Sequence, residues 1–182
     1  LIENNYSIDF IGTQNDPGSY PVIKNFNFDP DHQGRGGWTS GDILDQLESD
    51  LNLAGTPDVV LFSSPGGNDA LQNLPYDEAI GNINEIVDIL QDVNPNVTLI
   101  IEQMAPGRTD IMTEELLNYF NQLQDEILII AKNKATTTSQ VIAVDMFSGF
   151  TDAMLADDVH YNTKGAMFIA QRYFDVLTQV LE

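Results

Sequence analysis

The chain has 182 residues, the size of one α/β domain that buries about two thirds of its unfolded surface. Its net charge is −21, from 28 acidic and 7 basic residues, and such a surface repels nucleic-acid phosphates and anionic lipids. The absence of cysteine excludes disulfides, thiolate catalysis and cysteine-bound zinc. No apolar run approaches the ~20 residues of a membrane span. We therefore expect no nucleic-acid partner and no membrane span. The acidity is typical of solubility in a salty medium, with an acidic patch for a cationic partner as the alternative.

The first predicted strand covers residues 7–12, where apolar and polar side chains alternate before a glycine. Residues 13–37 are rich in Asn, Asp, Gly and Pro and predict a long loop, and loops of this length are usually functional. Ser40 follows this loop and is of a type that caps helices. The apolar side chains after it keep helical spacing and predict a helix; they are Ile43, Leu44, Leu47 and Leu51.

Three further short apolar runs predict parallel strands that are covered on both faces; they lie at residues 58–62, 97–101 and 141–145. Helical periodicity follows each run; these helices start at about Tyr76, at Thr113 and at Thr163. Strands that alternate with helices form a parallel sheet with helices on both faces. The sequence therefore predicts a single domain over residues 1–182, a three-layer α/β/α fold of the flavodoxin-like, doubly wound kind.

Polar residues that could do chemistry gather in three loops. Residues 31–39 read Asp-His-Gln-Gly-Arg-Gly-Gly-Trp-Thr, and residues 64–70 read Ser-Pro-Gly-Gly-Asn-Asp-Ala. The third loop, residues 155–162, reads Leu-Ala-Asp-Asp-Val-His-Tyr-Asn and precedes the last helix. In open α/β sheets, ligands bind in the loops at the carboxyl ends of the strands. These loops are therefore the candidate site.

Each loop has both a structural and a functional interpretation. An Asp three residues before a His can hold Nδ1–H and leave Nε2 as the base for a serine hydroxyl, or it can be an ordinary surface pair. The Gly-Gly-Asn-Asp sequence suits a turn after a strand, or an Asn side chain and a glycine N–H directed at one developing oxyanion. The glycines between residues 34 and 37 provide loop flexibility, or one of them donates to the oxyanion.

Together and in this order, the three loops resemble three of the four sequence blocks of the SGNH (GDSL-like) hydrolases. The resemblance is closest to the acetylxylan esterases of carbohydrate esterase family 3, and it runs from about residue 7 to the C-terminus. The pattern there reads like Asp-Phe-Val-Gly-Ser, Asp-His-Glu-Gly-His-Ser-Gly-Trp, Gly-Thr-Asn-Asp and Leu-Ala-Asp-Gly-x-His-Pro-Asn. This chain has its counterparts at residues 9–13, 31–38, 66–69 and 155–162.

The resemblance implies a role for residues in each block. His160 matches the general base and Asp157 the acid that orients it, while the Gly37 N–H and the Asn68 side chain match the oxyanion donors. Four more side chains are candidates for substrate binding: Arg35, Trp38, Asp69 and Tyr161. Three positions depart from the pattern, because Arg35, Gly67 and Tyr161 replace a His, a Thr and a Pro. Arg35 would place a cation at the edge of the cleft. We expect no metal and no cofactor.

The first block of the family, Gly-Asp-Ser after the first strand, has no counterpart in the sequence. Three explanations are open. The chain is N-terminally incomplete, with the serine nucleophile expected upstream of Leu1; or it is a natural non-catalytic protein; or Ser63 or Ser64 is the nucleophile. Strand one is an interior strand in the order 2-1-3-4-5. Without it, strands 7–12 and 58–62 either pair directly, which we favour, or another copy of the chain fills the gap.

These observations predict a serine ester hydrolase of the SGNH type, a carbohydrate O-acetyl esterase or a short-chain acyl esterase. Its substrate would be a small-molecule or carbohydrate ester, its location secreted or extracellular, and the chain alone would have little activity. A non-catalytic carbohydrate- or ester-binding pseudoenzyme is the alternative. A calcium site at Asp29 and Asp31 is a further alternative, although the remaining ligands of an EF-hand are absent from the sequence.

Overall fold

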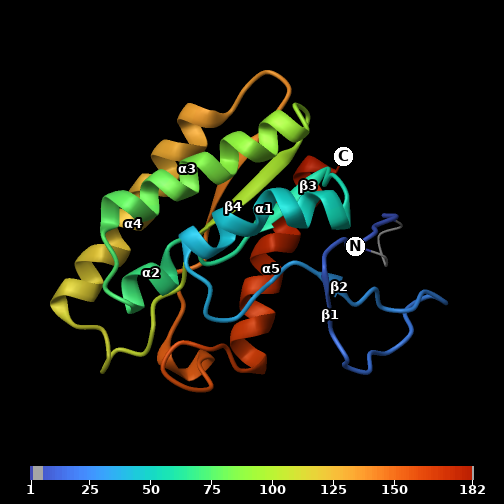
Figure 1. The fold of residues 1–182 in the computed structure, drawn as a ribbon. Coiled ribbons are helices and arrows are strands. Elements are labelled where there is room, and N and C mark those ends of the chain that lie inside the picture. The colour runs from blue at the N-terminus through green and yellow to red at the C-terminus, as the bar shows by residue number, and fades with distance from the viewer. Residues whose placement is uncertain (2–5, 182) are drawn as a thin grey trace.

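A parallel sheet with helices on both faces forms the centre of the computed structural model, which describes residues 1 and 6–181 (Figure 1). The strand order is β3-β4-β5, and both pairs of neighbours are parallel. The strands are β3 (Val59–Phe62), β4 (Thr98–Gln103) and β5 (Val141–Asp145). The predicted three-layer α/β/α class is confirmed, with a shorter sheet than expected.

Five helices are found among the described residues: α1 (Ser40–Ala54), α2 (Gly67–Leu71), α3 (Tyr76–Val93), α4 (Glu114–Lys134) and α5 (Thr163–Val180). The alternation of side chains along β4 divides the core into two. Leu99 and Ile101 pack toward α3 and α4, whereas Ile100 packs toward α5. Continuous apolar strands are thus covered on both faces, as the sequence predicts.

Helix starts differ by one residue from two of the sequence predictions. Thr39, not Ser40, caps α1, and its side chain forms a capping box with Asp42. Asn162, not Thr163, caps α5 by accepting hydrogen bonds from two amides of the first turn. In both cases the residue one position earlier has the extended backbone that a cap needs. Thr113 caps α4 as predicted.

The predicted strand at residues 7–12 is wrong, because residues 7–12 have no strand backbone pairing. A two-stranded antiparallel ribbon forms nearby instead, between β1 (Gln14–Asn15) and β2 (Asp31–His32). The direct pairing of residues 7–12 with β3 is wrong as well, since β3 is hydrogen-bonded to β4 alone among the described strands. A strand is stable only where a neighbour accepts its ladder hydrogen bonds, and alternation cannot supply that neighbour.

The outer edge of β3 is the open side of the sheet. Leu61, on this strand, is 39% exposed although the strand sequence is typical of a covered one. Within residues 1 and 6–181, no helix is both long and apolar enough to cross a membrane.

Candidate active site

The catalytic loop, defined here as residues 152–162, joins β5 to α5 and carries the Asp-His pair. It begins with a short 3₁₀ helix (Asp152–Met154) and closes with an antiparallel bridge between Leu155 and Tyr161. The Asn162 side chain holds the base of the loop, because its amide group donates to the carbonyls of Ala153 and Leu155, both at 3.0 Å. One residue thus caps α5 and crosslinks the loop before it.

Asp157 and His160 form the contact that their spacing predicts. The Asp157 carboxylate lies 2.9 Å from Nδ1 of His160, and it also accepts the amide hydrogens of His160 at 2.8 Å and Val159 at 3.0 Å. These backbone hydrogen bonds, His160 first, followed by the imidazole contact, lower the pKa of Asp157 to about 2. An ionised partner at Nδ1 favours the Nδ1–H tautomer and leaves Nε2 as the basic nitrogen. The catalytic roles themselves stay predictions.

Nε2 of His160 has no hydrogen-bond partner within the described part of the chain, and the side chain is 78% exposed. No serine hydroxyl therefore bonds to it. A general base must lie within hydrogen-bond reach of the proton that it removes. The described residues include the predicted base and its orienting acid, but no serine hydroxyl within hydrogen-bond reach of the base.

The two predicted oxyanion donors are tied together. Asn68 lies in α2, and its side-chain N–H donates to the carbonyl of Trp38 at 2.7 Å, directly after Gly37. Gly37 has a φ of 81°, the left-handed region that favours glycine. Its amide hydrogen has no acceptor among the described residues. The amide nitrogen of Asn68 carries a second hydrogen, so both residues retain a free donor.

Asp69 is not available to substrate, which corrects its assignment as a binding candidate. It is 2% exposed, and its two oxygens accept hydrogen bonds from Ser40, 2.8 Å from the amide and 2.7 Å from the hydroxyl. The acid therefore holds the start of α1 against α2. Because the two residues are far apart in the sequence, the Gly-Gly-Asn-Asp pattern alone could not distinguish this role from a binding role.

Arg35 also has an internal role instead of standing as a free cation at the cleft edge. Its guanidinium donates to the Thr13 hydroxyl at 2.8 Å and pairs with Asp50 of α1 at 3.3 Å. The same guanidinium lies over the Trp38 ring, 4.6 Å from its centre. Arg35 and Trp38 thus fix the loop that presents Gly37, and Asp50 balances the charge that would otherwise attract an anionic group.

A buried glutamate, Glu102, with hydroxyl groups beside it was missed by the sequence interpretation. Glu102, on the α5 side of β4, is 2% exposed and accepts the amide hydrogen of Ser64 at 2.8 Å. The hydroxyls of Tyr173 and Ser64 lie beside its carboxylate, and Tyr161 lies beside Ser64. Burial raises the pKa of Glu102, and burial together with this carboxylate raises the pKa of Tyr161. The sequence feature that could have indicated Glu102 is an acidic residue within the mostly apolar strand β4.

Tyr161 is consequently an anchor rather than an exposed binding side chain. It follows His160 directly, its hydroxyl is buried near Ser64, and its ring packs on Phe150 at 5.5 Å between centres. Tyr161 thus brings the residue after His160 close to Ser64, on the loop that leads to Asn68. The predicted cleft shared by His160, Gly37 and Asn68 stays a prediction, because no hydrogen bond joins the base to the donors within residues 1 and 6–181.

Ser64 has an unusual backbone. Its φ of 47° is left-handed, uncommon for a residue with a side chain, and it stands between β3 and α2. A serine on a strained strand-to-helix turn is also the geometry of the nucleophile in α/β-hydrolases. This keeps Ser64 as the alternative nucleophile, although its neighbours are Glu102 and Tyr161 and not His160.

We expect Glu102→Gln to gain stability relative to the wild type as the pH rises. Burial raises the pKa of Glu102 above its ordinary 4.5, so the folded state holds the proton more tightly than the unfolded chain. The wild type therefore loses stability as the pH rises above about 4.5, whereas glutamine does not titrate. Urea unfolding of both proteins at about pH 4 and about pH 7 measures the difference. The exposed Glu48→Gln is the control, and an equal difference at both pH values would contradict the expectation.

No cluster of three or more His, Asp or Glu side chains among the described residues could hold a metal ion. The two acids of the calcium alternative are engaged locally: Asp29 accepts the amide hydrogens of Phe10 and Asp31, at 2.7 and 3.2 Å. Asp31 itself accepts from the side chain of Asn15 at 2.9 Å. The site is therefore best described by the Asp-His pair and the two donors.

The chain is similar to one known protein family and to several solved structures. The model of the GDSL-like Lipase/Acylhydrolase family matches residues 15–167. A carbohydrate esterase family 3 structure from Talaromyces cellulolyticus is 30% identical, with a TM-score of 0.82 over 96% of this chain and 82% of that chain. An acetyl esterase with a serine-to-alanine mutation, solved with acetate ion, is 30% identical, with a TM-score of 0.81 and the same coverage, 96% and 82%. A family 3 carbohydrate esterase from Clostridium thermocellum is 28% identical, with a TM-score of 0.75 over 99% and 84% of the two chains.

No curated protein sequence matches the chain. The family match nevertheless spans most of the chain and contains all three loops, including the Asp157–His160 pair. Sequence blocks, fold and family match therefore agree, and the chain belongs to the GDSL-like lipase/acylhydrolase family.

Proposed function

We propose that the chain carries the acid–base half of a carbohydrate O-acetyl esterase or short-chain acyl esterase. The observation that supports this most directly is the Asp157–His160 contact of 2.9 Å on the loop before α5. In the proposed reaction Asp157 holds the imidazole, and Nε2 accepts the proton of a serine hydroxyl as that serine attacks the ester carbonyl. The Gly37 amide and the Asn68 side chain then donate to the oxyanion of the tetrahedral intermediate.

A small acyl group on a carbohydrate is the substrate class that we favour. Two of the structures similar to this chain are carbohydrate esterases of family 3, and a third is an acetyl esterase solved with acetate ion. Arg35 is paired with Asp50 and so leaves no unbalanced cation for an acidic substrate. A neutral ester fits this charge distribution. We also propose a secreted or extracellular location, where polymeric carbohydrate esters are accessible.

We expect residues 1–182 alone to hydrolyse 4-nitrophenyl acetate and acetylated xylan at close to the uncatalysed rate. Without a positioned hydroxyl the base has nothing to activate, and the donors alone give only residual catalysis. Release of nitrophenol and of acetate, compared with buffer, measures this. Clear turnover that disappears in Ser64→Ala and persists in Ser63→Ala would instead make Ser64 the nucleophile, with the serine supplied by the loop before α2.

A non-catalytic carbohydrate- or ester-binding protein is the second candidate function. The observation that favours it is the free Nε2 of His160, which bonds to no serine in the described part of the chain. Affinity electrophoresis in acetylated xylan distinguishes the two. Retention by residues 1–182, combined with inertness when a serine nucleophile is supplied as described in the Discussion, would support the binding protein.

A further inference from the structure

The exposure of the Asp157–His160 pair raises the question of what keeps it ordered. The two side chains are 57% and 78% exposed, so burial cannot hold them in one geometry. The Asp157 carboxylate is occupied by hydrogen bonds from within the loop itself. These bonds shape a local turn, but they do not attach it to the rest of the protein. Tyr161 anchors the loop on the His160 side. On the Asp157 side the attachment has to come from another segment.

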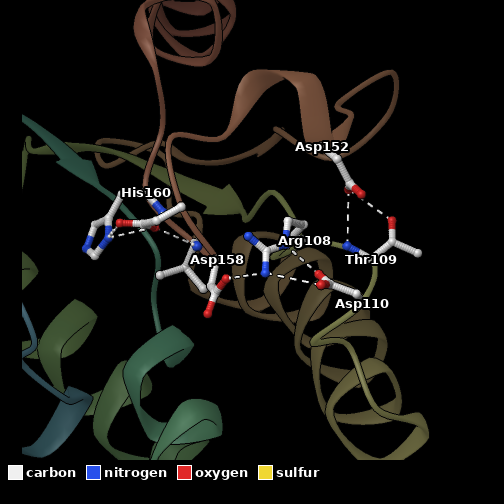
Figure 2. Close-up of polar contacts among 8 residues, drawn as sticks. Arg108, Thr109, Asp110, Asp152, Asp158 and His160 are labelled. Carbon is white, nitrogen blue, oxygen red and sulfur yellow. Dashed lines mark hydrogen bonds and ion pairs between the residues drawn. The ribbon is translucent and has the colours of Figure 1, made fainter.

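Arg108 provides that attachment, from the segment that follows β4. Its backbone N–H donates to the carbonyl of Asp158 at 2.8 Å, and its guanidinium contacts the Asp158 carboxylate at 2.7 Å (Figure 2). Arg108 therefore contacts both the main chain and the side chain of Asp158, the residue next to Asp157. The preceding Gly107 permits this approach, since an added Cβ there would lie 3.1 Å from the same carbonyl oxygen.

The guanidinium is itself held in place. Asp110 accepts from Nε at 2.5 Å and from a terminal nitrogen at 3.1 Å, and the same terminal nitrogen contacts Asp158 (Figure 2). The next residue, Thr109, donates from its amide and its hydroxyl to Asp152, at 3.1 and 2.9 Å. Arg108 and Thr109 thus clamp the catalytic loop at its start and directly beside the Asp-His pair.

Charge gives Arg108 a second effect on the same loop. Asp157 and Asp158 are adjacent carboxylates, and Asp110 and Asp152 lie close by. The hydrogen bond from Arg108 to Asp110, with the charges of Asp110, Asp158 and Asp152, raises the pKa of the guanidinium, which therefore stays protonated. The positive guanidinium of Arg108, paired with the Asp158 carboxylate, offsets the repulsion between Asp158 and Asp157. This repulsion would otherwise open the turn.

We propose that Arg108 is a positioning residue for the catalytic base: it fixes Asp158 so that the neighbouring Asp157 can hold His160 with Nε2 free. This inference rests on the proposed function, because it assigns Arg108 to the same reaction without contact to the reacting atoms. A planar, bidentate guanidinium is required, since Asp110 and Asp158 are engaged together.

Nuclear magnetic resonance of the histidine rings tests the proposal on residues 1–182 without any substrate. The chain has two histidines, so the His160 signals are readily assigned and His32 is an internal reference. In the wild type we expect one dominant Nδ1–H tautomer for His160. In Arg108→Ala we expect a tautomer mixture, and amide exchange at Val159 and His160 that is about tenfold faster. Arg108→Lys should restore the tautomer preference and the slow amide exchange only in part, because lysine keeps the positive charge but lacks the planar guanidinium.

Lys134→Ala is the matched control, since it removes one cation from an ion pair with Asp88, at the last residue of α4. It should leave the His160 ring and both amides unchanged. A folded Arg108→Ala with the wild-type tautomer and exchange rates would overturn the proposal. If Arg108→Ala does not fold, Arg108→Gln, which removes the ion pair and keeps the backbone hydrogen bond to Asp158, decides in the same way. Failure of the esterase assignment would show separately: the chimera described in the Discussion would not hydrolyse esters although the Asp157–His160 signature is intact.

Discussion

A chimera in which the Gly-Asp-Ser strand and helix of the family 3 esterase pattern precede Leu1 will hydrolyse short acyl esters, and His160→Ala will remove that activity. In triad enzymes, loss of the base costs about 10⁶-fold in kcat. Nε2 of His160 is exposed and its ring is oriented by Asp157, so we expect it to remove the serine proton. The rate of 4-nitrophenyl acetate hydrolysis measures the effect.

The open edge of β3 is the position that the added strand would occupy. In the flavodoxin-like order 2-1-3-4-5, strand one pairs with strand three, and the structure has no strand on that side of β3 among the described residues. His32→Ala is the matched control, because it removes the other histidine from the β1/β2 ribbon. An active chimera that tolerates His160→Ala would remove His160 from the mechanism. A folded but inert chimera that still binds acetylated xylan would favour the binding protein.

Asn68→Ala in the same chimera will lower kcat by about 10²- to 10³-fold with little change in KM, because an oxyanion donor acts mainly in the transition state. The Asn68 side chain donates to the Trp38 carbonyl at 2.7 Å and keeps a second N–H for the reacting oxygen. Kinetics with 4-nitrophenyl acetate over a range of concentrations separate kcat from KM.

Truncation of Asn68 also removes its bond to Trp38, so the melting temperature must be measured with the kinetics. Asn84→Ala is the control, since that side chain donates to the Ile80 carbonyl within α3 and to none of the site residues. A rise in KM with unchanged kcat would mean that Asn68 binds substrate equally in the ground and transition states. The donor role would then pass to Gly37 alone.

The predictions for His160 and Asn68 both depend on the polar groups that hold their two loops. Glu102 holds the Ser64 amide, and Tyr161 reaches Ser64 from the residue after His160. The base loop and the donor loop therefore meet near Glu102 and Ser64, while Arg108 holds the base loop from its exposed side. A change in any of these groups is expected to alter the orientation of His160 relative to Asn68.

The sequence by itself determined the parts of this protein that depend on local pattern. The strands β3, β4 and β5 are short apolar runs, α3 and α4 keep helical spacing, and each was predicted within about two residues of its observed position. The Asp157–His160 contact is equally local, because three residues of turn bring the two side chains together. The order of the three loops was enough to indicate the family.

Only the tertiary structure decided which of the remaining polar residues face the site. Residues 7–12 form no strand, because a strand requires a neighbouring ladder that lies elsewhere in the chain or outside it. Asp69 and Arg35 were candidate binding residues, but Ser40 and Asp50 occupy their polar groups. Glu102 and Arg108 act across separations of 38 and 50 residues, on Ser64 and Asp158. Burial and hydrogen bonding over such separations depend on how the chain packs, which residue type and spacing do not encode.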